Sequence, residues 1–205
     1  EIPREGKVFV QEYSQGKPFK PVEVVGEAED TGTTVTFHPD PEIFQVTTVY
    51  KYDTLAARLR ELAYLNKGIR LTLTDRRNLV NDVDENGNEL ETTHFRNDVF
   101  YSKDGLKEFV EYLDGGAERL IESPIYLETD KIIPIEIALQ YNTSYTEKIY
   151  SYVNNINTIE GGTHLAGFRR ALTRTLKKYA DDTKALEKAK VEISGEDFRE
   201  GLTAI

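Results

Sequence analysis

Residues 160–182 read EGGTHLAGFRRALTRTLKKYADD, and the interpretation of the whole chain starts from this stretch. It carries five basic side chains and no acidic one between Glu160 and Asp181, although the 205-residue chain has a formal net charge of -10 at pH 7. A uniformly acidic solvated surface does not require such a cluster. We therefore expect this segment either to contact something negatively charged or to move.

The spacing of the apolar residues predicts an amphipathic helix. At about 100° per residue, five apolar side chains fall within an arc of roughly 80° that we expect to face the core. They are Leu165, Phe168, Leu172, Leu176 and Tyr179. Arg170, Arg174, Lys177 and Lys178 lie on the opposite side. Arg169 lies at the edge of the apolar stripe, where an arginine is partly ordered and can project into a cleft or cavity.

Two interpretations of the basic face remain open at this point. The first is a solvated face whose cations are favoured near the helix C-terminus by the macrodipole. The second is a stripe that holds phosphates locally, because salt screens distant acids beyond about 8 to 10 Å. The preceding Gly161-Gly162-Thr163 is likewise either a hinge or anion cradle, or a tight turn with Thr163 as N-cap.

The chain before this stretch reads as strands followed by a helix. Residues 7–14, 22–29 and 33–38 are rich in β-branched and aromatic residues and predict three successive strands. A helix should follow, with Asp53 as its N-cap and an end near residues 66–68. A strand over 68–77 is expected next. Residues 78–95 form a polar, variable or mobile excursion, whose ENGN predicts a tight hairpin turn.

The second half predicts another α+β arrangement. A helix within 102–116 should have Ser102 as its cap and end at the glycine pair. Three strands are expected over 123–130, 133–142 and 147–156. Along the second of them apolar and mixed residues alternate, which predicts a half-buried sheet. Residues 194–202 predict a capped final helix, and the terminal TAI reads as the start of a strand. The two α+β units should meet near residue 97.

Composition narrows the function classes. No run reaches the roughly 18 to 20 apolar residues of a membrane helix and no signal peptide is visible, so we expect a cytoplasmic protein with no membrane partner. The absence of cysteine excludes disulfides and thiolate sites. His38, His94 and His164 are scattered, so no metal site is expected. The chain has no methionine, and we expect it to be part of a longer protein.

Five segments in order resemble a known family. They are REGKVFVQEYSQGKP (4–18), TGTTVTFHPDPEIF (31–44), YDTLAARLRELAYLNKGIRLTLTD (52–75), FVEYLDGG (109–116) and NNINTIEGGTHLAGFRRALTRTLKKY (154–179). Together they closely resemble the B subunit of bacterial DNA gyrase, within the type IIA topoisomerase group. The resemblance implies an α+β fold. Residues 1–97 would be the C-terminal part of a GHKL (Bergerat) ATPase sheet, and residues 98–205 a C-terminally incomplete transducer domain like domain 2 of ribosomal protein S5.

The resemblance also carries three site residues over. Thr33 matches a threonine of the adenine-recognition network, whose hydroxyl can both donate and accept a hydrogen bond. Arg4 matches an arginine at the rim of the same nucleotide pocket, on the side where aminocoumarins bind. Arg169 matches an arginine that lines a DNA cavity between two transducer domains, and Arg170 and Arg174 are expected to contact DNA with it.

The family implies ATP and Mg²⁺ as cofactors of the whole enzyme. Its partners would be the gyrase A subunit in an A2B2 heterotetramer, double-stranded DNA, and a second B subunit on ATP binding. The family's catalytic glutamate, glycine-rich lid and QTK loop are not found in these residues. We therefore expect no catalytic or metal residue here, no bound cofactor, and no ATP hydrolysis by this chain alone.

Three alternatives accompany this interpretation. The B subunit of topoisomerase IV shares most of the motifs, although GGTHLAGF is more typical of gyrase. A non-enzymatic nucleic-acid-binding module on an S5-like sheet would bind DNA with a salt dependence of several phosphates. A folded interaction domain without a ligand would show no such binding. The role of residues 78–94 beyond joining two strands is not determined by the sequence.

Overall fold

The computed structural model describes the backbone of all 205 residues and every side chain except that of Val83. Packing divides the chain into an N-terminal unit, Glu1–Lys51, and a C-terminal unit, Tyr52–Ile205. The expected family boundary between residues 97 and 98 lies within strand β7 (Glu89–Tyr101) and remains a prediction.

The N-terminal unit is built on a three-stranded antiparallel sheet. Its strands β1 (Ile2–Arg4), β2 (Lys7–Val10) and β5 (Glu23–Glu27) lie in that order. Glu5 and Gly6 join β1 to β2 with φ values of 54° and 76°, as a two-residue hairpin turn requires. A second small hairpin pairs β3 (Tyr13–Ser14) with β4 (Lys17–Pro18).

The strand expected over residues 33–38 is not present, and that prediction is wrong. Residues 32–34 run beside β1 with only isolated hydrogen bonds, from Gly32 N to Pro3 O at 3.1 Å and from Thr34 N to Glu1 O at 2.7 Å. Pro39 and Pro41 follow closely, and proline has no backbone donor for a continuing ladder. The segment is therefore an irregular edge rather than a strand.

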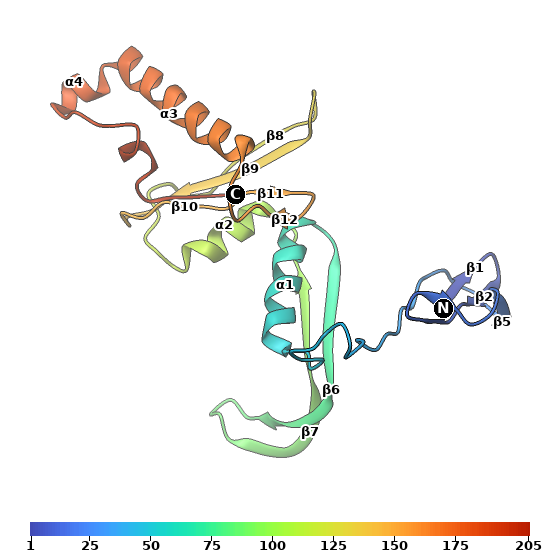
Figure 1. Cartoon of the computed structure of the whole chain (residues 1–205). Helices are drawn as coiled ribbons and strands as arrows, with labels where there is room; N and C mark the ends of the chain where they lie inside the picture. The colour runs from blue at the N-terminus through green and yellow to red at the C-terminus, as the bar shows by residue number, and fades with distance from the viewer. The chain divides into compact units, whose positions relative to one another are not determined.

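The C-terminal unit begins with helix α1 (Tyr52–Leu65), which packs on a long antiparallel hairpin (Figure 1). The hairpin consists of β6 (Arg70–Val83) and β7 (Glu89–Tyr101). Tyr52, Ala56, Ala63 and Phe100 form the buried cluster between helix and hairpin. The expected helix is confirmed, but Asp53 lies inside its first turn rather than at its N-cap.

The hairpin turn expected at ENGN is confirmed, and the strands extend much closer to it than the polar sequence indicates. Oδ1 of Asp84 accepts hydrogen bonds from the backbone N–H groups of Asn86 at 2.8 Å and Asn88 at 2.9 Å. Gly87, with φ of 84°, completes the turn. Residues 78–95 are thus mostly paired strand rather than an irregular excursion, because the local turn sets the register between the strands.

The second part of the C-terminal unit is a four-stranded sheet between helices. The sheet order is β10 (Lys148–Ile149), β13 (Leu202–Ala204), β9 (Ile135–Tyr141) and β8 (Ile125–Thr129). β13 pairs with β10 in parallel and with β9 antiparallel, so the chain between β10 and β13 forms a crossover. That crossover contains the small hairpin β11 (Tyr152–Val153) and β12 (Ile156–Asn157), then α3 (Thr163–Thr183), α4 (Ala185–Ala189) and the 3-10 turn η1 (Asp197–Arg199).

Helices cover both faces of this sheet. Helix α2 (Leu106–Asp114) packs on the face of Ala138, while Phe168 and Leu172 of α3 pack on the face of Leu139 and Leu202. The predicted alternation along β9 is confirmed. The prediction that only one face of the sheet is buried is wrong, because Gln140 is fully buried on the second face. Its amide nitrogen donates to the carbonyl oxygen of Ile121 at 2.8 Å, while its buried Oε1 has no hydrogen-bond partner among the described residues.

Several helix ends differ from expectation. Gly162 rather than Thr163 takes the N-cap position of α3, and the expected final helix over 194–202 is only the short turn η1. Gly105 takes the N-cap position of α2, while Ser102 accepts a hydrogen bond from the Gly105 N–H just before it. Gly115 ends α2 in the left-handed conformation as expected, and the TAI strand is confirmed as β13.

Candidate nucleic-acid interface and nucleotide pocket

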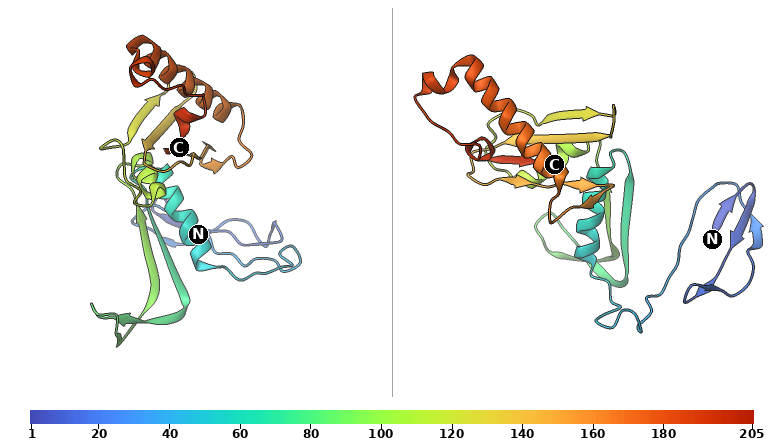
Figure 2. Two further views of the ribbon diagram at one scale, coloured as in Figure 1. Left: turned by 90° about the vertical axis from the view of Figure 1, so that its left-hand side faces the viewer. Right: turned by 45° about the horizontal axis from the view of Figure 1, so that its top comes forward.

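Helix α3 carries the basic residues that the sequence singled out, and it lies at the opposite end of the C-terminal unit from the tip of the β6–β7 hairpin (Figures 1 and 2). Arg170 and Arg174 are exposed, one turn apart, and none of the ion pairs among the described side chains involves either. The face toward the sheet is half-buried at Leu165, Phe168, Leu172 and Leu176. Tyr179 is 67% exposed, so its predicted place in the core is wrong. The next residue, Ala180, is buried instead.

Arg169 differs from the other two arginines because it is already paired. Its Nη2 lies 2.6 Å from Oε1 of Glu147, and its Nε donates to the same oxygen at 2.7 Å. The other oxygen of Glu147 accepts a hydrogen bond from Nε of Arg199 at 2.9 Å. One carboxylate therefore holds two guanidinium groups, one from α3 and one from η1.

The ionisation of Glu147 follows from this arrangement. Partial burial acts to raise the pKa of Glu147, but the hydrogen bonds from Arg199 and Arg169 outweigh it and leave the pKa below its ordinary value. The carboxylate is therefore charged at neutral pH. It remains available as a partner for both arginines throughout the physiological range.

The turn before α3 is tight and held by hydrogen bonds. Gly161 has a φ of 78°, and its N–H donates to the carbonyl oxygen of Thr158 at 2.7 Å. The hydroxyl of Thr158 is hydrogen-bonded to Nε2 of His164 at 2.9 Å. These contacts support the tight-turn interpretation of the glycine pair and give His164 a structural partner.

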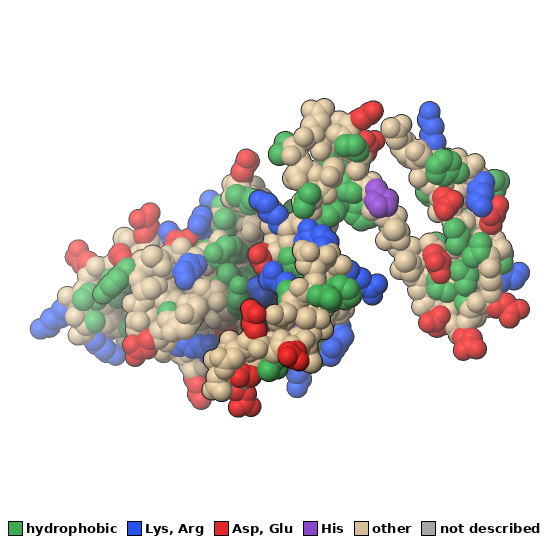
Figure 3. Space-filling model, turned by 90° about the horizontal axis from the view of Figure 1, so that it is seen from below, with side chains coloured by type: hydrophobic (Ala, Val, Ile, Leu, Met, Phe, Trp, Pro, Cys, Tyr) green, Lys and Arg blue, Asp and Glu red, His purple; other side chains and the backbone are tan. Residues whose placement is uncertain are grey.

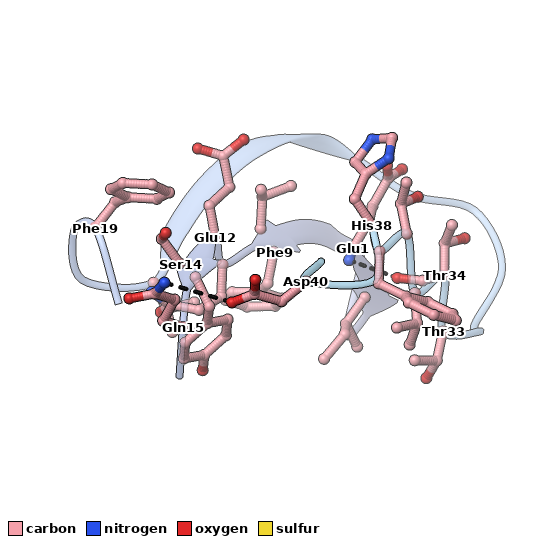
Figure 4. Close-up of a pocket in the computed structure, with 18 of the residues that line it drawn as sticks. Glu1, Phe9, Glu12, Ser14, Gln15, Phe19, Thr33, Thr34, His38 and Asp40 are labelled. Carbon is pink, nitrogen blue, oxygen red and sulfur yellow. Dashed lines mark hydrogen bonds between the residues drawn. The ribbon is translucent and has the colours of Figure 1, made fainter. Parts of the chain in front are cut away.

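The N-terminal unit contains an open pocket of about 1180 Å³ (Figure 4). Thr33, Thr34 and His38 lie at one end of it, and Ser14, Gln15 and Phe19 at the other. The ammonium of Glu1 donates to the carbonyl oxygen of Thr34 at 2.9 Å. This bond holds the segment that contains Thr33 and Thr34 next to the start of β1. The volume exceeds the roughly 300–1,000 Å³ of common ligand pockets.

The structure places Thr33 and Arg4 near the same sheet but not in the same pocket lining. Thr33 lines the pocket, whereas Arg4 is absent from its described lining and has a side chain that is 72% exposed. Nε of Arg4 lies 3.6 Å from Oε1 of Glu5, its neighbour in the β1–β2 turn. A rim position for Arg4 therefore remains a prediction.

The chemistry of the pocket lining bears on the predicted nucleotide contact of Thr33. A threonine hydroxyl in a pocket with aromatic and polar walls suits recognition of a base. Among the described residues no group of three or more His, Cys, Asp or Glu could hold a metal ion. A contact between Thr33 and a nucleotide base therefore remains a prediction.

Comparisons with known proteins bear on the family of this chain. The family model described as DNA gyrase B matches residues 105–205. The DNA gyrase B subunit of Eisenibacter elegans is 60% identical over 205 residues, covering all of this chain and 41% of that protein. The corresponding protein of Cytophaga aurantiaca is 58% identical over 202 residues, covering 98% of this chain and 40% of that protein. The chain thus spans about two fifths of the length of these relatives.

A solved structure is similar over almost the whole chain. The crystal structure of the 43K ATPase domain of Thermus thermophilus gyrase B in complex with an aminocoumarin covers 99% of this chain and 52% of its own, at 35% identity and a TM-score of 0.79. The fold is therefore that of the ATPase and transducer region of a type II topoisomerase of the gyrase B type. The chain belongs to the DNA gyrase B family.

Glu147 and Arg199 are the site residues that sequence reasoning missed. They lie 22 and 30 positions from Arg169, outside any helical spacing, and only the crossover from β10 to β13 brings them to α3. A lone glutamate before a short strand and an arginine in a turn have no distinguishing pattern. Separately, no described helix has the length and apolar character needed to cross a membrane.

Proposed function

We propose that this chain forms part of a gyrase B protein that couples ATP binding and hydrolysis to the passage of one DNA duplex through another, with negative supercoiling as the result. The observation that carries the proposal is helix α3, which presents Arg170 and Arg174 to solvent from a sheet with a buried core. Membership of the DNA gyrase B family supports a DNA-contacting role for this basic helix. The topoisomerase IV alternative is not favoured, because the relatives described above are gyrase subunits.

Within this proposal the chain supplies two functional parts. Residues 1–97 belong to the GHKL ATPase domain, with Thr33 on the adenine side of the pocket and Arg4 at its rim. Residues 98–205 form the S5-like transducer, with Arg169, Arg170 and Arg174 along the DNA path. ATP with Mg²⁺ is the cofactor of the whole enzyme, and the aminocoumarin held by the Thermus thermophilus protein is consistent with a ligand pocket in this region. We expect no ATP hydrolysis by the 205-residue chain alone.

The partners follow from the same proposal. Double-stranded DNA is the substrate, the gyrase A subunit completes an A2B2 heterotetramer, and a second gyrase B chain joins when ATP binds. A chromosomal substrate places the enzyme in the bacterial cytoplasm. In this scheme nucleotide binding closes the ATPase domains, and the transducer moves as a rigid body, which is a hinge type of motion.

The test uses the intact gyrase B protein assembled with gyrase A on relaxed plasmid. Arg170→Gln combined with Arg174→Gln should reduce supercoiling at least about tenfold while leaving ATP hydrolysis within about twofold, because these side chains contact DNA rather than nucleotide. Lys131→Gln is the control, since Lys131 is an exposed cation in the turn between β8 and β9.

Two outcomes contradict the proposal. If the double variant supercoils DNA as well as the unmutated enzyme does, Arg170 and Arg174 of α3 do not contact DNA during strand passage. An unmutated enzyme that unlinks DNA but does not supercoil it identifies the topoisomerase IV activity instead.

A further inference from the structure

Arg169 is the most exposed member of a cluster of three charged side chains. Its side chain is 43% exposed, that of Glu147 is 26% exposed, and that of Arg199 is 15% exposed. The exposed fraction therefore decreases from Arg169 on α3 through Glu147 to Arg199. A ligand that arrives from solvent therefore meets Arg169 before it meets the carboxylate.

Arg199 is held independently of Arg169. Its Nη1 donates to the carbonyl oxygen of Gly195 at 2.7 Å and to Oγ1 of Thr173 at 3.2 Å, while its Nε donates to Glu147. These bonds connect η1 to α3 and hold the Arg199 guanidinium next to the Glu147 carboxylate. Loss of Arg169 would thus leave Glu147 with a charged, hydrogen-bonded partner.

The backbone around the cluster is fixed by the sheet. Glu147 immediately precedes β10, and Arg199 lies two residues before Gly201 and close to β13. Asn142 N donates to Gly201 O at 2.9 Å, and Ile149 pairs with Ala204. The side chain of Arg169 can consequently change partners without any rearrangement of the sheet.

We propose that Glu147 competes with DNA phosphate for Arg169. Without DNA, Glu147 neutralises and holds Arg169, while Arg170 and Arg174 form no ion pair with any described side chain and make the first contacts with the duplex. A phosphate near α3 then replaces Glu147 as the partner of Arg169, and Arg199 remains to neutralise Glu147. This inference rests on the proposed DNA role of α3 and assigns Glu147 as a positioning residue that weakens DNA binding at this helix.

The physical basis is an exchange of nearly equivalent bonds. Carboxylates and phosphates both accept paired hydrogen bonds from a guanidinium. Because Arg169 gives up a charge-assisted contact through two of its nitrogens to gain another, its net gain from DNA is smaller than that of an unpaired arginine. A DNA path weakened in this way lets the duplex leave as well as enter, which strand passage requires.

The experiment is a double-mutant cycle on the intact gyrase B protein. Binding of a linear duplex is measured by fluorescence anisotropy at several salt concentrations for Glu147→Gln, Arg169→Gln and the double variant. Glu147→Gln should bind about 3- to 10-fold more tightly, and its salt dependence should steepen by about 0.9, the value for one added phosphate contact. In the Arg169→Gln background, Glu147→Gln should no longer tighten binding, because Glu147 then has no Arg169 side chain for which to compete with phosphate.

Two controls separate the possible results. Glu122→Gln removes the same charge from an exposed site elsewhere and should leave binding unchanged. Thermal unfolding of each variant establishes that the comparison concerns folded protein. The proposal is overturned if Glu147→Gln weakens binding, leaves it unchanged, or strengthens it equally in the Arg169→Gln background. If combined substitution of Arg169, Arg170 and Arg174 leaves binding unaffected, the proposed function itself fails.

Discussion

The two units of the chain differ sharply in how much of each is buried. None of the side chains described in Glu1–Lys51 is buried, and hydrophobic residues such as Val35, Phe37 and Val46 are exposed on it. Figure 3 shows green hydrophobic side chains on this unit beside red acidic ones. In Tyr52–Ile205, by contrast, three buried clusters lie under α1, α2 and α3.

The two candidate sites therefore lie on parts of the chain that differ in burial. Within these 205 residues the pocket around Thr33 lies on a small sheet without a buried side chain among those described, whereas α3 rests on a packed core. If stability in this chain follows burial, substitutions at buried positions in Tyr52–Ile205 should cost more than matched substitutions in Glu1–Lys51.

Gly201→Ala should be the most damaging substitution. Gly201 has a φ of 67°, and a Cβ there would overlap the carbonyl oxygen of Asn142. We expect a loss of about 4 kcal/mol in the free energy of unfolding, measured by urea denaturation, because strain and steric overlap add. Gly26→Ala in β5 is the matched control: nothing lies within 4 Å of its Cβ position, and its effect should be within about 1 kcal/mol. Equal effects would contradict the comparison.

Truncation of Leu202 should cost somewhat less. Leu202 is fully buried in a cluster with Leu139 and Phe168, so Leu202→Ala should lower the free energy of unfolding by about 3 kcal/mol. Val24 in β5 is 53% exposed, and Val24→Ala should cost less than about 1 kcal/mol. Chemical denaturation followed by circular dichroism provides the measurement. A larger cost at Val24 would show that the N-terminal sheet carries a core of its own.

A single hydrogen bond provides the next test. The hydroxyl of Tyr152 donates to Oε1 of Glu61 at 2.6 Å and joins β11 to α1, and burial together with this bond raises the pKa of Tyr152. Tyr152→Phe should cost about 1 kcal/mol of unfolding free energy. Tyr13→Phe, at a side chain in β3 that is 62% exposed, should leave the thermal midpoint unchanged. If Tyr152→Phe leaves the free energy of unfolding unchanged, this hydrogen bond makes no net contribution to stability.

The smallest effect is expected in the β6–β7 hairpin, which is exposed although it belongs to the C-terminal unit. Hydrogen bonds from the Arg77 side chain and backbone lower the pKa of Asp75 to about 2. Because the folded-state pKa is depressed, the stabilisation is complete above the ordinary value of 3.8 and is lost as the pH falls through about 2. An NMR titration should place the midpoint near 2. In Arg77→Gln it should return toward 3.8; an unshifted midpoint in the unmutated protein would disprove the pairing.

Much of the secondary structure was predictable because its signals are local. The apolar stripe of α3, the glycine end of α2 and the Asn-Gly turn of the hairpin each depend on a few neighbouring residues. The failures at Tyr179 and Gln140 have the opposite origin. Each depends on what lies against the segment, which the local pattern does not contain.

The candidate sites divide in the same way. Motif resemblance in the sequence points to Thr33, Arg4, Arg169, Arg170 and Arg174, and their assigned roles remain predictions. The pairing of Arg169 with Glu147 was not predictable, since the two residues are brought together only by the crossover between β10 and β13.

The sequence by itself determined the family, the α+β class and the basic helix, because these reside in ordered motifs and in side-chain periodicity. Only the tertiary structure decided which arginine is already paired, which face of the sheet buries a glutamine, and which glycine cannot be replaced. The physical reason is range. Helical and turn preferences act over a few residues, whereas charge pairing, burial and steric overlap depend on atoms that the folded chain brings together from distant positions.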